Sequence, residues 1–267
     1  MERLMVVKLA AQGCTAELWM NGLPVARATP RAPQVLVSVH EAACVGANRL
    51  ELVADVTDQP GNAAPRRNAT ALQDMAARAQ LLLPRMGSPI DETLTRTLAQ
   101  LDWACPRGET LSLPVRRFQE AELPLRLPRW RWLDAPIVAQ PGAELKLQAH
   151  TFVTGLARDL ARGQFESFMT ATRLRTEELA LAYLRSPESE AARMREWLEQ
   201  MFASSRLVWQ PLTAEELQLR PLAGGRLLEC LGGDGRHALT TVPDELGNTL
   251  ALPLRLSVVE GRFYVLR

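Results

Sequence analysis

The sequence has few of the features that identify a specialised class of protein. Tyrosine occurs only twice and histidine three times in the 267 residues. No run of 18 apolar residues is present, so we expect no transmembrane helix. Lysine and arginine (31) nearly balance aspartate and glutamate (30). A net charge of +1 gives no strong field toward nucleic acid or an anionic membrane, so we expect neither as a partner.

Cysteine is also scarce and scattered along the chain. The four cysteines are Cys14, Cys44, Cys105 and Cys230. They form no C-x-x-C pair, and no histidine lies at zinc-finger spacing from them, which predicts buried thiols, no metal and no cofactor. The first 14 residues read MERLMVVKLAAQGC, where Glu2 and Lys8 are atypical of an export signal. We therefore expect a cytoplasmic protein.

Motifs of known catalytic sites are missing as well. His40, His150 and His237 lie far apart, and none belongs to an H-E-x-x-H motif or follows a G-x-S-x-G elbow. The glycine pairs and runs near residues 224 and 232–235 separate predicted strands and lack the spacing of a phosphate-binding loop. The sequence predicts turns at these glycines.

The first half of the chain is rich in proline and in short alternating segments, which predicts a β-sandwich over residues 1–138. Residues 15–20 and 23–27 flank Asn21-Gly22, a dipeptide typical of a tight hairpin turn. Further strands are expected at 35–39, 50–56, 79–83, 97–104, 111–118 and 129–133. The polar segment 57–70 is expected to be a long surface loop.

The second half, residues 139–267, starts with helical periodicity and ends with alternation. Three helices are predicted over 145–160, 165–184 and from 186, where Pro187 suits the first helical turn. Strands follow at 206–209, 217–222, 226–231, 236–242, 249–259 and 262–266. This order predicts an α+β domain with three helices on a curled antiparallel sheet.

Two families share parts of this pattern. Residues 18–25 (LWMNGLPV) and 46–52 (GANRLEL) resemble the galactose-binding-like jelly-roll modules of many glycosidases, some of which bind sugars. The second half resembles the NTF2-like superfamily, which has a cone-shaped α+β fold. The NTF2-like resemblance rests on element order and on the GQFESF segment at 163–168. That fold includes enzymes, small-molecule binders and interaction modules, so it implies no single function.

Residues 129–132 (RWRW) are the most conspicuous binding candidate. In a strand, Trp130 and Trp132 share one face while Arg129 and Arg131 share the other. Paired indoles suit stacking on a sugar or anchoring of a protein partner. The alternative is that both rings fill the core and the arginines are solvated.

In the second half, the polar candidates for a site are Tyr183 on a helix and Glu229, His237 and Arg255 on strands. An acid and a tyrosine in the cone perform proton transfer in ketosteroid-isomerase-like relatives, but none of these residues aligns to that pattern. Arg255 lies opposite the leucine stripe of its strand and is expected to face solvent.

These observations favour a non-catalytic binding protein whose partner is another protein, such as an accessory or immunity-type protein of a bacterial secretion or toxin system. Two alternatives stay open: a carbohydrate-binding module, and an isomerase- or hydrolase-type enzyme that binds a small apolar ligand in the cone.

Overall fold

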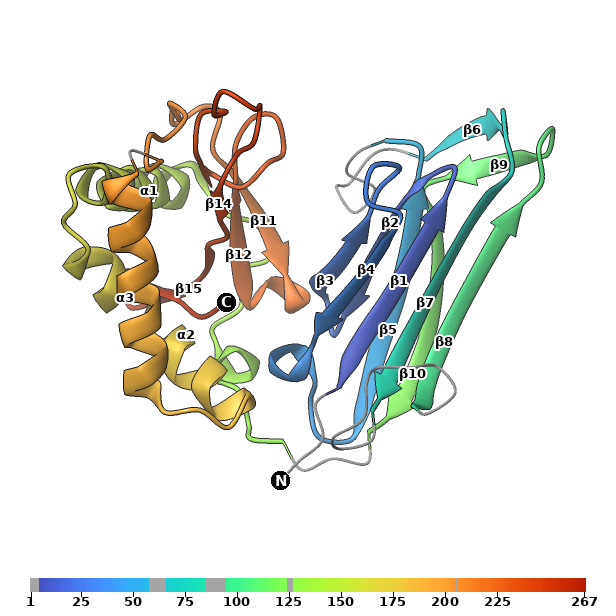
Figure 1. The fold of residues 1–267 in the computed structure, drawn as a ribbon, viewed down its shortest axis with the longest axis horizontal. Helices are drawn as coiled ribbons and strands as arrows, with labels where there is room; N and C mark the ends of the chain where they lie inside the picture. Colours follow the sequence, from blue (N-terminus) through green and yellow to red (C-terminus); the bar gives the residue numbers. More distant parts are fainter. Residues whose placement is uncertain (1–4, 58–65, 85–94, 124–126, 205) are drawn as a thin grey trace. The chain divides into compact units, whose positions relative to one another are not determined.

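A computed structural model describes residues 5–57, 66–84, 95–123, 127–204 and 206–267 (Figure 1). The chain divides into two compact units, Met1–Arg129 and Trp130–Arg267. Within the described ranges the first unit is almost entirely β-structure, and the second combines three α-helices with antiparallel strands.

The first unit is built from two four-stranded antiparallel sheets. Their strand orders are β4-β1-β7-β8 and β10-β5-β2-β3, and a two-stranded ribbon, β6-β9, is separate from both. The elements are β1 (Val6–Gln12), β2 (Thr15–Met20), β3 (Leu23–Ala28), β4 (Gln34–Ser38), η1 (His40–Ala42), β5 (Ala47–Asp55), β6 (Arg67–Thr70), β7 (Met75–Leu83), β8 (Arg96–Cys105), β9 (Thr110–Leu113) and β10 (Val115–Glu122).

Alternation along the strands gives each sheet one apolar face. On β2, Leu18 and Met20 are fully buried, and they lie opposite Leu52 and Leu50 of β5. The β2–β3 turn at Asn21-Gly22 has positive φ at both residues, as the sequence predicts for a tight hairpin. Side chains of the opposite parity therefore lie on the outer face of this sheet.

The second unit carries three helices on one side of a four-stranded sheet of order β11-β12-β15-β16 (Figure 1). Its elements are η2 (Arg131–Asp134), α1 (Ala143–Ala161), α2 (Glu166–Ala182), α3 (Pro187–Ala203), β11 (Gln218–Leu222), η3 (Ala223–Gly225), β12 (Leu227–Leu231), β13 (Leu239–Thr240), β14 (Ala251–Leu252), β15 (Arg255–Val259) and β16 (Arg262–Val265). The helices cover the face that bears Cys230, Leu256 and Val265.

Helix α3 starts as its sequence predicts. Ser186 is the N-cap, its hydroxyl oxygen accepts a hydrogen bond from the Ser189 amide at 3.0 Å, and Pro187 follows at the first helical position. The inward side chain Leu198 is fully buried in the core of the second unit. Helix α2 runs without a break through Thr176, whose hydroxyl donates to the Thr172 carbonyl.

Several predicted strands are shorter or differ in type. The predicted strand at 249–259 is divided at Pro253 into β14 and β15, because proline has no amide hydrogen for the ladder. β14 pairs with β13, whereas β15 pairs with β12 and β16. The prediction of one continuous strand with a single apolar face is therefore wrong. Part of the expected 57–70 loop is strand β6, and residues 58–65 lie outside the described ranges.

The division between the units falls between Arg129 and Trp130, whereas the sequence places it after residue 138. The intervening segment belongs to the second unit because it bonds to η3. The Val138 amide donates to the Gly225 carbonyl at 2.8 Å, and the Arg226 guanidinium donates to the Ala135 carbonyl at 2.8 Å. A Cβ at Gly225 would lie 3.0 Å from the Val138 carbonyl oxygen, so only glycine permits this approach.

Candidate functional site

The two tryptophans of the RWRW segment are buried. Trp130 is 1% exposed and Trp132 is 2% exposed. The predicted strand at 129–133 is wrong, since Trp130 is the extended N-cap of the 3₁₀-helix η2 and Trp132 lies within it. The Trp132 indole nitrogen is buried and has no hydrogen-bond partner in the described part of the chain. In this arrangement the rings act as packing and present no stacking face.

A network of charged groups surrounds Trp130, and we call Trp130, Arg131, Glu178 and Arg267 the buried node. One Glu178 carboxylate oxygen accepts a hydrogen bond from the Arg131 amide at 2.6 Å, and the other is paired with the Arg267 guanidinium. The Arg267 guanidinium carbon lies 5.4 Å from the centroid of the Trp130 ring. Arg131 takes part in the node through its amide alone, because its side chain is exposed and pairs with Glu177 at 2.9 Å. Arg129 is also exposed. The node joins η2, helix α2 and the second residue after β16.

Glu229 is the centre of an ion-pair ladder across three strands. Register places it directly opposite Arg220 of β11 and Arg255 of β15. The Nε atoms of Arg220 and Arg255 lie 3.0 and 3.2 Å from its two carboxylate oxygens. Glu229 is fully buried, and each arginine side chain is 18% exposed. Arg255 therefore contacts a carboxylate, where the sequence analysis expected it to face solvent.

Burial opposes the ionisation of Glu229, but the guanidinium groups of Arg255 and Arg220 outweigh this effect and lower the pKa of the carboxyl. His237 adds a smaller attraction, because its bridge to Leu231 places it on the side of the sheet that bears Glu229. A carboxylate held in its ionised form by two arginines is a poor proton donor. The ladder is thus better suited to stabilising the sheet than to acid catalysis.

Tyr183 is at a different position in the second unit. It is the C-cap of α2, and the Arg185 guanidinium carbon lies 5.8 Å from the centroid of its ring. Helix α2 packs against β16, which is separated from β12 by β15. The structure therefore brings Glu229, His237 and Arg255 together, but places Tyr183 with the helices.

The first unit contains a group of aromatic and charged residues that the sequence analysis missed. Register puts Trp19, Glu51 and Phe118 in one row across β2, β5 and β10. Two strand spacings separate the aromatic residues at the ends of this row by about 10 Å. All three lie on the outer face of their sheet, since Leu18 and Met20 occupy the inner one.

Arginines and a second glutamate complete this surface, which we call the Trp19 face; its members are Glu17, Trp19, Arg27, Arg49, Glu51, Arg116 and Phe118. Arg27 donates to Glu17 at 2.7 Å, and Arg116 is paired with Glu51. The Arg49 guanidinium carbon lies 4.4 Å from the Phe118 ring centroid, and Phe118 is 49% exposed. The outward parity of Trp19 was readable in the sequence, but its row with Phe118 required the strand register.

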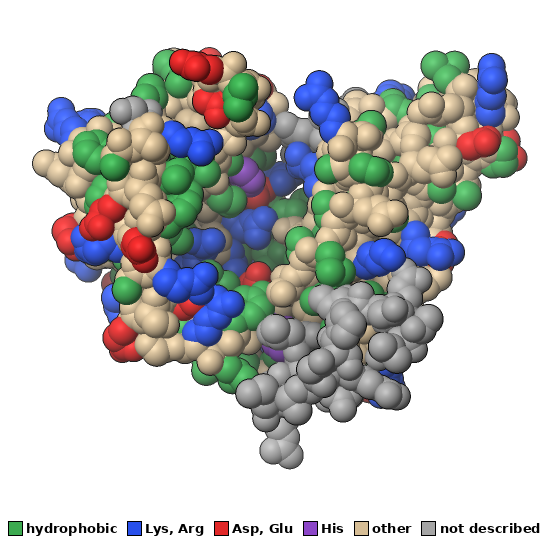
Figure 2. All heavy atoms as spheres, viewed as in Figure 1, with side chains coloured by type: hydrophobic (Ala, Val, Ile, Leu, Met, Phe, Trp, Pro, Cys, Tyr) green, Lys and Arg blue, Asp and Glu red, His purple; other side chains and the backbone are tan. Residues whose placement is uncertain are grey.

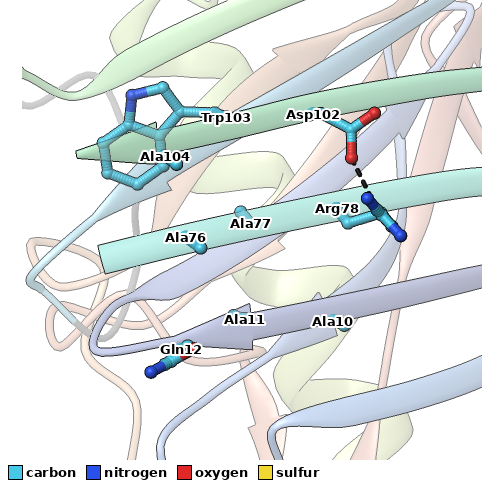
Figure 3. Close-up of a pocket in the computed structure, with 9 residues that line it drawn as sticks. All are labelled: Ala10, Ala11, Gln12, Ala76, Ala77, Arg78, Asp102, Trp103 and Ala104. Carbon is cyan, nitrogen blue, oxygen red and sulfur yellow. Dashed lines mark hydrogen bonds and ion pairs between the residues drawn. The ribbon is translucent and has the colours of Figure 1, made fainter. Parts of the chain in front are cut away.

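A shallow hollow of about 450 Å³ lies on the outer face of the other sheet, where alanines leave space between larger side chains (Figure 3). Ala76 of β7 lies between Gln12 of β1 and Ala104 of β8, and the next outward row is Ala10, Arg78 and Asp102, in which Arg78 and Asp102 form an ion pair at 2.6 Å. A stripe of small residues is not by itself a binding site, so this hollow gives no functional indication.

In the view of Figure 2, hydrophobic side chains are scattered among charged ones. No three histidine, cysteine, aspartate or glutamate side chains in the described ranges are grouped to hold a metal ion. None of the described helices is long and apolar enough to cross a membrane. The described cysteines form no disulfide with one another, and Cys14, Cys105 and Cys230 are buried.

Comparison of the chain with protein-family models, curated proteins and solved structures finds no match.

Proposed function

We propose that this chain is a non-catalytic binding protein whose partner is another protein, and that the Trp19 face is the contact surface. The observation that carries the proposal is the row of Trp19, Glu51 and Phe118 with three arginines around it. Tryptophan and arginine are the residue types that most often dominate binding energy at protein interfaces. Because Trp130 is enclosed in the buried node, the proposal assigns the anchor residues for the partner to the first unit.

The ionic groups of this face are already arranged in pairs, which limits the cost of covering them. Glu17 is 2% exposed in its side chain, and Arg27 is paired with it. Glu51 and Arg116 are 20% and 34% exposed in their side chains and form the second pair. A partner that covers these pairs buries charges that already have a counter-charge, which limits the free-energy cost of desolvation. Arg49 supplies a cation beside Phe118 for an acidic group of the partner.

The same proposal includes the fold type of each unit, the cellular location and the role of the protein. The first unit is a jelly-roll-like sandwich and the second an NTF2-like α+β domain, in a cytoplasmic protein with an accessory or immunity-type role. The two four-stranded antiparallel sheets of the first unit and the three helices with antiparallel strands of the second support the fold assignments in this proposal.

The test uses two variants with equally exposed apolar side chains. Phe118 is 49% exposed on β10, and Leu36 is 48% exposed on β4 of the other sheet. Quantitative affinity capture from the source cells, followed by titration with the purified partner, compares Phe118→Ala, Leu36→Ala and the unmodified chain. We expect Phe118→Ala to weaken the binding of a captured partner by more than about 2 kcal/mol. Leu36→Ala is expected to leave that binding unchanged. Equal binding by both variants would contradict the proposal.

Carbohydrate binding is the second candidate, and the same row favours it. The aromatic rings of Trp19 and Phe118 can stack on a sugar, and the Glu51 carboxylate between them can accept hydrogen bonds from the sugar hydroxyls. A panel of immobilised glycans separates the two functions. Saturable binding of one sugar that is lost in Trp19→Ala and Phe118→Ala supports the carbohydrate module and contradicts a protein partner at this face.

A further inference from the structure

At one end of the first unit, the β6–β9 ribbon covers a partly open cavity. Register pairs Ala69 with Leu111 and Arg67 with Leu113, so these four side chains share the face of the ribbon on which Leu113 is fully buried. Asn68 lies on the other face and is exposed. Figure 1 shows the ribbon beyond the end of the two main sheets.

Two contacts fix the ribbon and the loop after β6 in place. The Arg67 guanidinium is bound to the Asp55 carboxylate at the end of β5, with one N–O distance of 3.2 Å. The Gln73 side-chain amide donates to the Gly13 carbonyl in the β1–β2 turn at 3.1 Å. A Cβ at Gly13 would lie 2.4 Å from the Asp74 carbonyl oxygen, so this turn depends on glycine.

The space between the ribbon and the sandwich has a cavity volume of about 540 Å³. This falls within the range of small-molecule sites, about 300 to 1,000 Å³. Its lining is mainly apolar and includes Met75, Leu111, Leu113 and the buried Cys14. Val56 and Leu72 of the same lining are 57% and 85% exposed, so part of the apolar lining is open to solvent.

The charged groups beside this cavity are already engaged. The Asp55 oxygens accept hydrogen bonds from the Val56 amide at 2.6 Å and from Arg67. Burial raises the pKa of the Cys14 thiol to about 11, so the thiol is neutral at pH 7. The polar side chains among the lining residues are uncharged: Thr15, Gln73, whose amide donates to the Gly13 carbonyl, and Thr70, which lies on the outer face of β6 with Asn68. None of the described lining residues is ionised, so against this lining a ligand with a full charge would lose its hydration without gaining a counter-ion.

We propose that this cavity is a binding site for a small, neutral, apolar molecule with at most one or two hydrogen-bonding groups. The site is independent of the Trp19 face, which lies on the outer surface of the β10-β5-β2-β3 sheet. Each can fail without the other.

The experiment titrates the full-length protein with 1-aminoanthracene, a neutral fluorophore whose emission rises in apolar surroundings. Ala69→Phe places a ring in the cavity from β6, and Asn68→Phe places the same ring on the outer face of the same strand. We expect saturable binding to the unmodified chain and to Asn68→Phe, and at least tenfold weaker binding to Ala69→Phe. An anthracene sulfonate of the same size is expected to bind at least tenfold more weakly than the amine.

Equal binding by the three proteins would place the fluorophore elsewhere and overturn the proposal, as would no binding to the unmodified chain. If Ala69→Phe does not fold, the methyl resonance of Met75 in the unmodified protein replaces the variant. A shift of that resonance on addition of the fluorophore supports the cavity as the site. An unchanged resonance with bound fluorophore overturns it.

Discussion

The buried node of the second unit and the Trp19 face of the first use the same residue types in opposite surroundings. In the node, Glu178 and Arg267 are each 5% exposed, and Trp130 is 1% exposed. On the Trp19 face, Phe118 is half exposed and Arg49 is exposed. An aromatic ring and an arginine are thus buried in one unit and exposed in the other, although Glu17 of the Trp19 face is as buried as Glu178. Which role they take depends on the backbone that carries them.

The backbone difference has a simple cause. Trp19 lies in a strand of a sheet, so its outward direction follows from the alternation of its neighbours. Trp130 lies where the chain enters a short 3₁₀-helix, and the bond from the Arg131 amide to Glu178 holds that segment against α2. Local periodicity therefore predicts the direction of the Trp19 side chain but not that of the Trp130 side chain.

The largest expected effect concerns the charge pair of the buried node. Glu178→Ala leaves the Arg267 guanidinium buried without its carboxylate, which costs about 3 to 5 kcal/mol of unfolding free energy. The control is Glu177→Ala, one residue away, because the Glu177 side chain is 29% exposed and pairs with exposed arginines. Its loss costs less than about 1 kcal/mol. Urea unfolding measures both. Equal losses would show that the node carries no special stability.

A somewhat smaller effect is expected at the ladder. Glu229→Gln removes the charge shared by Arg220 and Arg255 and costs about 3 kcal/mol, the lower end for a buried pair, because both arginines keep some contact with water.

The ladder also makes stability depend on pH. Since the folded pKa of Glu229 lies below the ordinary value of 4.5, its stabilising contribution is complete above that pH and is lost as pH falls through the folded pKa. Melting temperatures between pH 7 and pH 3 measure this. The difference between the unmodified chain and Glu229→Gln is expected to shrink toward acid pH. A constant difference would contradict the assigned role of the carboxylate.

The Trp19 face is expected to respond weakly in stability. Arg49→Ala removes a cation over an exposed ring, and such a contact is worth about 0.5 to 1 kcal/mol at an exposed site. Thermal unfolding should therefore change by only a few degrees, while partner binding falls and loses part of its dependence on salt. A large loss of stability would instead show that Arg49 stabilises the folded state, and would contradict a role in partner binding alone.

The smallest expected effect is that of chelation. With no metal-binding group of side chains in the described ranges, EDTA should leave the melting temperature unchanged. A drop of several degrees would reveal a site formed by dispersed residues.

Much of the secondary structure was predictable because it is set locally. The Asn21-Gly22 turn and the Ser186-Pro187 helix start depend on residues within a few positions, and both are found as predicted. Pro253 is visible in the sequence, but the five alternating leucine and valine residues around it predict an unbroken strand. There the missing backbone donor decided the structure.

The sites were less predictable because they depend on register and long-range contact. The sequence analysis named Glu229, His237 and Arg255 separately, but their shared position follows from the pairing of β12 with β15 and the bridge to Leu231. In the same way, Trp19 and Phe118 are 99 positions apart and meet in one row only through Glu51 of β5. No local pattern contains that information.

The most direct test of the contrast between the two clusters is a pair of thermal and urea unfolding experiments on Trp130→Ala and Trp19→Ala. The first substitution removes a fully buried ring and should cost about 3 to 5 kcal/mol. The second removes a half-buried ring from an outer sheet face and should cost about 1 kcal/mol, with the fold retained. Similar losses of stability in the two variants, or a larger loss in Trp19→Ala, would contradict the assignment of packing to one tryptophan and recognition to the other.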